Sequence, residues 1–207
     1  MRKLIAEDIK IFAAGAKLSA AFTAAVTDII TSAAHGLSEE DRIQVSSSTT
    51  LPAGLSASTD YFVRDVTTNT FKVSTTKGGA AVDITDTGTG VHTFVLKGKK
   101  ILVSDAEAII LAINTQNSAN FTLQVQGSTQ EDVDFNAAAS PTNRHSYLQI
   151  VDLDTGTKYA GNVGYVLAGV DKNLMFEVNV SGMRWVTLLV SSWSAGDMSA
   201  KASIYGE

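Results

Sequence analysis

Short stretches of alternating apolar and polar residues recur along the chain, and they predict an all-β protein. Between positions 27 and 95 these stretches are separated by clusters of Gly, Asn, Asp, Ser and Thr, which are typical of turns. The strands expected in this region cover residues 28–31, 42–45, 61–64, 71–74, 82–84 and 92–95. Short strands in such a series suit a small barrel or sandwich.

The pattern of apolar and polar residues changes after Lys100, where it predicts longer strands with longer polar connections. The expected strands cover residues 101–103, 108–113, 120–126, 147–153, 176–180, 184–190 and 199–205. Residues 108–113 are apolar at every position, which predicts a strand covered on both faces. The other segments alternate, and none has helical periodicity. This part predicts an antiparallel β-sandwich of jelly-roll type.

The first strand, at residues 8–12, must pair with a sheet elsewhere because it cannot form a core alone. The nearest open sheet is the one expected after Lys100. We therefore expect a discontinuous anchoring β-sandwich of residues 1–24 plus 97–207, with residues 25–96 inserted as a small β module that projects from the surface. Insertions succeed where the two chain ends lie close together in a surface loop. Two domains in series are the alternative.

Charge and composition narrow the function classes. The chain carries 16 Lys and Arg against 21 Asp and Glu, a net charge of -5, so the phosphate neutralisation that drives nucleic-acid binding is not expected. The absence of cysteine excludes disulfides, thiolate metal sites and cysteine nucleophiles.

Targeting and membrane signals are not expected either. Glu7, Asp8 and Lys10 interrupt the apolar residues near the N-terminus, which is unlike a signal peptide. No stretch approaches the roughly 20 apolar residues of a membrane span. The sequence predicts a protein that is made and folded in a cytoplasm.

The residues that could carry chemistry favour structural interpretations. His35, His92 and His145 have no metal-ligand spacing, and we expect His35 in an exposed turn. The segment 152–156 (DLDTG) departs from a calcium loop in its glycine position, and it predicts a hairpin turn.

The remaining motifs follow the same trend. The acidic residues Glu131, Asp132 and Asp134 are expected in a solvated loop, and no GxSxG or Walker pattern occurs. We expect no catalytic residue, no cofactor, no metal and no enzyme activity.

A few residues are instead candidates for contact with a partner. We expect Trp185 in the core, whereas Trp193 lies where a strand is expected to end and is either a core residue or an interface anchor. The candidate interface residues are Ile9, Ile11, Phe12, Arg144, His145 and Trp193.

Several short strings between positions 27 and 95 resemble a module that recurs in structural proteins of tailed bacteriophages. These strings are AHGL (34–37), LPAGL (51–55), TDYFV (59–63), NTFKV (69–73) and DITDTGTGVH (83–92). The flanking segments 118–135, 147–156 and 176–186 more loosely resemble small phage capsid decoration proteins. In such families the inserted module would project outward from the particle.

The resemblance implies a virion structural protein that binds the outer surface of a phage capsid and stabilises it, as a decoration or cement protein. The expected partner is the major capsid protein, the expected oligomer is a homotrimer, and the expected location is the capsid surface after assembly in the host cytoplasm. Neither nucleic acid nor membrane is expected as a partner. A tail or baseplate subunit is one alternative, and a carbohydrate-binding module is another.

Overall fold

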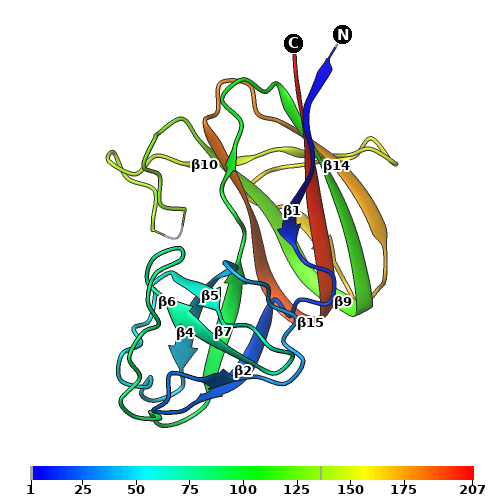
Figure 1. Cartoon of the computed structure of the whole chain (residues 1–207). Coiled ribbons are helices and arrows are strands. Elements are labelled where there is room, and N and C mark those ends of the chain that lie inside the picture. Colours follow the sequence, from blue (N-terminus) through cyan, green and yellow to red (C-terminus); the bar gives the residue numbers. More distant parts are fainter. Residues whose placement is uncertain (1, 136) are drawn as a thin grey trace. The chain divides into compact units, whose positions relative to one another are not determined.

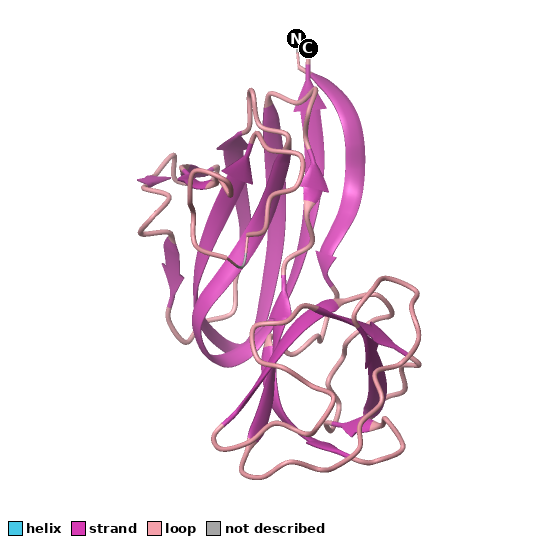
Figure 2. Ribbon diagram, turned by 90° about the vertical axis from the view of Figure 1, so that its left-hand side faces the viewer, coloured by secondary structure: helices cyan, strands magenta, loops and turns pink. Residues whose placement is uncertain are grey.

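The computed structural model describes residues 2–135 and 137–207, and its regular elements are all β-strands. All pairings between named strands are antiparallel. The predicted fold class, an antiparallel β-sandwich with an inserted barrel module, is confirmed (Figures 1 and 2). Within the described part, no helix is long and apolar enough to cross a membrane.

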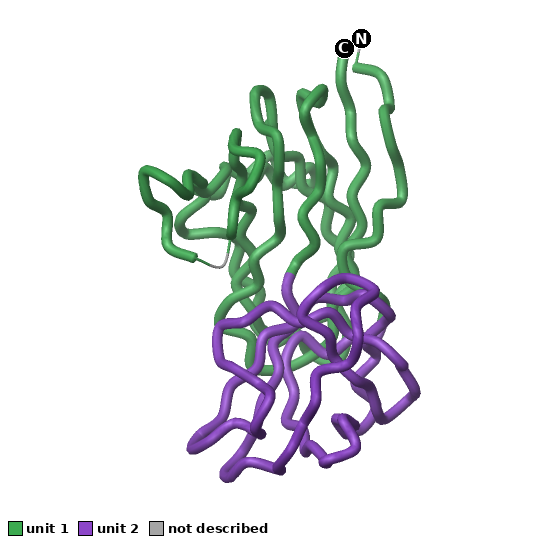
Figure 3. Tube along the Cα trace, turned by 60° about the vertical axis from the view of Figure 1, so that its left-hand side comes forward, with its two compact units in different colours: residues 1–14, 98–207 green, residues 15–97 purple. Residues whose placement is uncertain are grey.

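The chain divides into two compact units (Figure 3). Unit 1 contains residues 1–14 and 98–207, and unit 2 contains residues 15–97. The first boundary lies earlier than the expected one at residue 24, because strand β2 (Ser19–Ala24) pairs with two strands of unit 2. The Ala-rich stretch that contains β2 therefore belongs to the inserted unit.

Unit 2 is a closed barrel whose strands follow the order β2–β3–β6–β5–β4–β7. Besides β2, the strands are β3 (Ile30–Thr31), β4 (Arg42–Ser47), β5 (Tyr61–Arg64), β6 (Thr70–Ser74) and β7 (His92–Lys97). Alternate residues point inward, as β7 shows by burying His92, Phe94 and Leu96. Closure pairs every strand on both sides, so the barrel avoids the free edges that promote aggregation.

The prediction of a strand at residues 82–84 is wrong. This segment forms no strand, yet it is held in place: Val82 N–H donates to the Val73 carbonyl at 2.8 Å, and Ile84 N–H donates to Asp28 Oδ1 at 2.9 Å. Ile84 is fully buried. The apolar residues that suggested a strand instead fill the barrel from an irregular segment.

Unit 1 is built around two long strands, β9 (Ala108–Ser128) and β15 (Trp185–Gly206). The other strands are β1 (Lys3–Phe12), β8 (Ile101–Leu102), β10 (Ser146–Leu148), β11 (Ile150–Asp152), β12 (Lys158–Tyr159), β13 (Tyr165–Leu167) and β14 (Asn173–Asn179). The main order across the sheet is β1–β15–β9–β14–β11–β12.

The two halves of each long strand have different neighbours. The first half of β9 pairs with β14, and its second half pairs with β10 and β13. Likewise β15 pairs with β8 near its start and with β1 near its end. Figures 1 and 2 show the long strands curving round at one end of unit 1. A single sheet thereby supplies both layers of the sandwich.

The long strands have irregular backbone geometry at the curve. Asn117 and Ser118 in β9 and Ser192 in β15 have positive φ, and the register between β9 and β15 shifts between Ser191 and Asp197. Gly196 (φ +83°) approaches the backbone of Ala119 closely enough that a Cβ atom would lie 2.6 Å from the Ala119 nitrogen. Bulges and left-handed residues of this kind bend strands.

The core of unit 1 lies between the inward faces of these layers. Its largest fully buried side chains include Phe121, Phe176, Ile109 and Leu111. Tyr165 packs on Phe176 with ring centroids 4.9 Å apart. Such aromatic pairs add stabilisation beyond their buried area.

The expectation that residues 108–113 are covered on both faces is wrong. Ile109, Leu111 and Ile113 are buried, but Ile110 is half-buried and Ala112 is exposed. The strand therefore alternates in burial although its sequence does not alternate in polarity, and it presents apolar side chains outward.

Candidate functional site

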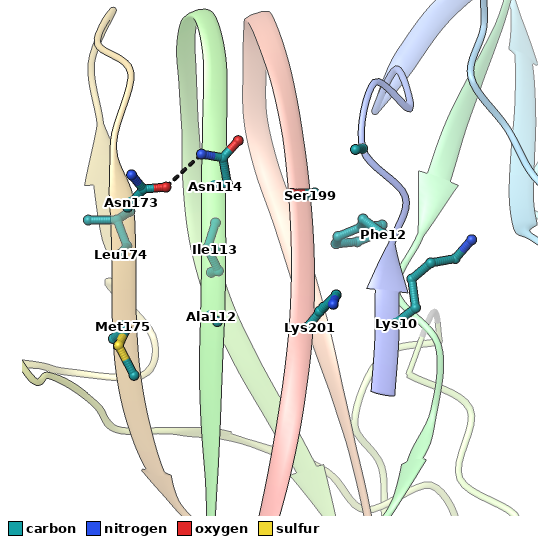
Figure 4. A pocket seen from close by; sticks show the side chains of 11 residues that line it. Lys10, Phe12, Ala112, Ile113, Asn114, Asn173, Leu174, Met175, Ser199 and Lys201 are labelled. Atoms are coloured by element: carbon teal, nitrogen blue, oxygen red, sulfur yellow. Dashed lines mark hydrogen bonds between the residues drawn. The ribbon is translucent and has the colours of Figure 1, made fainter. Parts of the chain in front are cut away.

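The outward-facing side of the sheet in unit 1 carries a row of side chains that crosses four strands. In the strand register Ala112 lies between Met175 and Lys201, and Lys201 lies opposite Lys10. We call the surface marked by Met175, Ala112, Lys201 and Lys10 the outer face (Figure 4). Met175 is 46% exposed and Ala112 is exposed, so the row begins with apolar contacts and ends with two ammonium groups.

A hollow of about 460 Å³ lies along this row. Its lining continues with Asn114, whose Nδ2 donates to Asn173 Oδ1 at 2.6 Å, and with Ser199 on β15. The buried Phe12 also borders the hollow. The outer face therefore combines an apolar surface with amide and hydroxyl groups on one side.

The charged side chains of the outer face lie at one end of the row. The charged residues that line the hollow are Lys10 and Lys201, and Lys201 Nζ lies 2.9 Å from Asp8 Oδ1. Asp8 has positive φ at a register shift in β1. Asp8 and Lys201 thus form an exposed ion pair at the end of the hollow that Lys10 also lines.

A second charged group borders the same sheet. Arg2 lies 2.7 Å from Glu177 Oε1 and 3.4 Å from Glu107 Oε2. The hydrogen bond and charge of Glu177 raise the pKa of Arg2 above its ordinary value. Since these groups are solvent-exposed, the ion pairs contribute little to stability.

The candidate interface residues on β1 are buried or half-buried. Ile11 is 1% exposed and Phe12 is 2% exposed, so both side chains are buried, and Phe12 borders the hollow of the outer face. Phe12 lies opposite the buried Ala200 on β15. Ile9 is half-buried and lies opposite Ala202.

The two loop residues among the candidates organise their own loop. Arg144 is exposed, and its Nε donates to the Pro141 carbonyl at 3.1 Å. His145 Nε2 lies 3.0 Å from the Ala137 carbonyl oxygen, and its ring centroid lies 5.6 Å from that of Phe135. The loop is thus internally bonded just before β10.

Trp193 is half-buried and lies inside β15, whereas the sequence had suggested that a strand ends there. Its Nε1 donates to the Gly196 carbonyl at 3.3 Å, across the curve of the long strand. The six candidates are distributed over β1, the loop before β10 and the curve of β15. The structure does not gather them into the outer face.

The histidines of unit 2 differ from expectation. The exposed turn predicted for His35 is wrong, because His35 is fully buried and its ring packs edge-on against Phe71 at 5.0 Å. His92 is also buried, with Nδ1 3.1 Å from Ser47 Oγ and Nε2 3.0 Å from the Thr87 carbonyl oxygen.

The acidic motifs have the structures that the sequence predicted. Glu131 is exposed and pairs with Arg184 at 2.9 Å. In the turn at residues 152–156, Asp152 Oδ1 accepts hydrogen bonds from the N–H groups of Asp154 (2.9 Å) and Thr155 (3.1 Å). Among residues 2–135 and 137–207, no group of three or more His, Cys, Asp or Glu could hold a metal ion.

Comparison with known proteins gives one structural match. No protein-family model matches the chain, and no curated protein matches it. Among solved structures, the crystal structure of SPBc2 prophage-derived protein YomS aligns with a TM-score of 0.38 and 11% identity, over 53% of this chain and 80% of that chain. A likeness of this size carries no argument about function.

Proposed function

We propose that this chain is a structural protein of a tailed-phage particle that binds the outer surface of the capsid and stabilises it. In this proposal unit 1 makes the contact through its outer face, the partner is the major capsid protein, and the chain acts as a homotrimer. Unit 2 is the part that projects from the particle. The observation that carries the proposal is the exposed apolar part of the row on the outer face.

That row is unusual for a sheet that faces water. The outward residues of a one-sided sheet are normally polar, but here Ile110, Ala112 and Met175 share the outward side. Leu153 is 42% exposed, and its N–H donates to the Met175 carbonyl, so it extends the row. Completing the burial of a half-exposed Met or Leu contributes on the order of 1 kcal/mol. Such contacts, repeated in each subunit of an oligomer, reinforce one another through multivalent binding.

The link to a virion comes from the sequence. The strings AHGL, LPAGL, TDYFV, NTFKV and DITDTGTGVH resemble a module of phage structural proteins, and all of them lie within unit 2. Because these strings resemble an inserted module that would project outward, we assign attachment to unit 1 and projection to unit 2.

The test is co-sedimentation of the purified chain with capsids that lack it. The variant Ala112→Arg places a third cationic group in the row beside Lys201, and we expect it to weaken binding at least tenfold. Val166→Arg is the matched control, because Val166 is 61% exposed on β13, outside the outer face. Circular dichroism and tryptophan emission show whether both variants are folded.

Two results would count against the proposal. If the wild-type chain does not sediment with capsids, or if labelling places it on tails, capsid attachment is wrong. If Val166→Arg weakens binding as much as Ala112→Arg, the outer face is not the contact.

A further inference from the structure

His35 occupies a junction of three segments in unit 2. Its backbone carbonyl accepts the N–H of Lys17 at 2.9 Å. The preceding residue, Ala34, donates its N–H to Asn69 Oδ1 at 2.9 Å. The next residue, Gly36 (φ +65°), lies so close to Gly15 that a Cβ atom would be 2.7 Å from the Gly15 carbonyl carbon. The segment around His35 thus ties the chain before β2 to the turn before β6.

The imidazole ring is held in one protonation state by the backbone. Nδ1 lies 3.0 Å from the N–H of Leu37, which is a donor, so Nδ1 must be the unprotonated nitrogen that accepts this hydrogen bond. The single proton of the neutral ring is therefore on Nε2. Nε2 makes no hydrogen bond to any described residue, and the side chain is fully buried.

Protonation of Nδ1 would convert this contact into two donors facing each other. The Leu37 N–H would lose its acceptor while buried, since Leu37 is only 5% exposed. A buried donor without a partner is destabilising. The charged ring can therefore form only if the turn at residues 35–37 opens.

Burial of the ring outweighs the backbone groups that would favour a positive charge. Burial lowers the pKa of His35 below its ordinary value, the Thr70 and Thr67 carbonyls partly offset this shift, and the Lys17 ammonium makes the smallest contribution, which also lowers the pKa. Lys17 Nζ donates to the Ala33 carbonyl at 2.7 Å, so it is fixed near this turn.

The other neighbours do not reverse this balance. The Phe71 ring packs against the imidazole, and the Asp41 carboxylate accepts the Ser38 N–H at 2.8 Å.

We infer that His35 is an acid-sensitive lock on the barrel of unit 2, which holds the turn at residues 35–37 closed while the ring is neutral and releases it when the ring is protonated. The sign follows from linkage. Protons bind the open or unfolded segment more readily than the closed one. The closed turn therefore keeps its full stability against opening above a pH of about 6.5 and loses stability as the pH decreases below that value.

The experiment is native-state hydrogen exchange on the full chain at pH 7.5 and 5.0, corrected for intrinsic exchange rates. Amides of residues 30–37 and 70–74 should show an opening constant that rises by up to roughly 30-fold, the limit for a group with an open-state pKa near 6.5 that stays neutral when closed. Amides of residues 109–113 in unit 1 should not share that increase.

Two variants separate the lock from general acid sensitivity. In His35→Asn the amide oxygen takes the place of Nδ1 as acceptor and cannot titrate, so we expect the pH dependence in residues 30–37 to disappear. His92→Asn is the matched control, because His92 is another buried histidine of unit 2, and it should keep the dependence.

Nitrogen NMR of the wild-type imidazole provides a test that needs no variant. At pH 7.5 the His35 ring should show an unprotonated Nδ1 and a protonated Nε2. A protonated Nδ1 at that pH would overturn the inference. So would a pH dependence that survives in His35→Asn, or one that is lost equally in His92→Asn.

Discussion

The curve of the long strands in unit 1 depends on Gly196, and replacing it with alanine tests that dependence. Gly196 has φ +83°, where any residue with a Cβ is strained by about 1–2 kcal/mol. In addition, its Cβ would lie 2.6 Å from the backbone nitrogen and 2.7 Å from the Cβ of Ala119 on β9. These contacts are closer than real Cβ atoms show, so the backbone of one strand must move.

The expected loss is the sum of both effects. Overpacking against a fixed backbone adds about 1–3 kcal/mol to the conformational strain. We therefore expect Gly196→Ala to lower the free energy of unfolding of unit 1 by about 2–5 kcal/mol. Gly182→Ala is the control, because Gly182 has φ +77° but nothing within 4 Å of the added Cβ, so it should lose only about 1–2 kcal/mol.

Denaturant unfolding followed by tryptophan fluorescence is the appropriate measurement. Both tryptophans, Trp185 and Trp193, lie in unit 1, so the signal follows this unit without a contribution from unit 2. Equal losses in Gly196→Ala and Gly182→Ala would refute the reasoning, because they would show that the contact with Ala119 is relieved without cost.

Three further changes to unit 1 have expected outcomes in the same assay. Phe176→Ala removes a fully buried ring and should lower the free energy of unfolding by about 3–5 kcal/mol; a loss below 1 kcal/mol would contradict the core position. Asp152→Ala removes the acceptor of two turn N–H groups and should lose about 1–3 kcal/mol, whereas Asp154→Ala, at an exposed neighbour, should lose much less. Glu131→Gln breaks an exposed ion pair with Arg184 and should change stability by less than about 1 kcal/mol; a larger loss would show that the pair is not a surface pair.

The local elements were the part of the fold that sequence could predict. Residues 61–64 alternate in polarity between clear turn signals, and the structure has a strand with these bounds. The long strands were harder, because Asn117 and Ser118 have the composition of a turn and suggested two separate strands. In the structure they sit at the curve of one strand, where pairing with β15 continues on both sides.

The outer face and the buried histidine depend on contacts between distant residues. Lys10, Ala112, Met175 and Lys201 come from four strands, and only the register places them in one row. The apolar run at residues 108–113 was the available signal, but it could not show whether its outward side is covered.

The prediction of an exposed turn at His35 was wrong for a similar reason. The string AHGL has the appearance of an exposed turn, and it is buried because Phe71 and the chain at Lys17 pack over it. Local composition gives no access to such packing.

The pairing of β1 with β15 has a consequence for the order of folding. Phe12 lies opposite Ala200, so the whole of unit 2 and most of unit 1 must be synthesised before the first strand finds its partner. During synthesis unit 2 can close as a barrel by itself, and β2 and β7, through which the chain enters and leaves it, are paired neighbours. Because the closed barrel shortens the effective loop between β1 and β15, it lowers the entropic cost of pairing these strands by only roughly 0.5 kcal/mol. The first strand therefore stays unpaired on the ribosome until β15 emerges, and during that time its unpaired backbone groups and its apolar residues need protection from other chains.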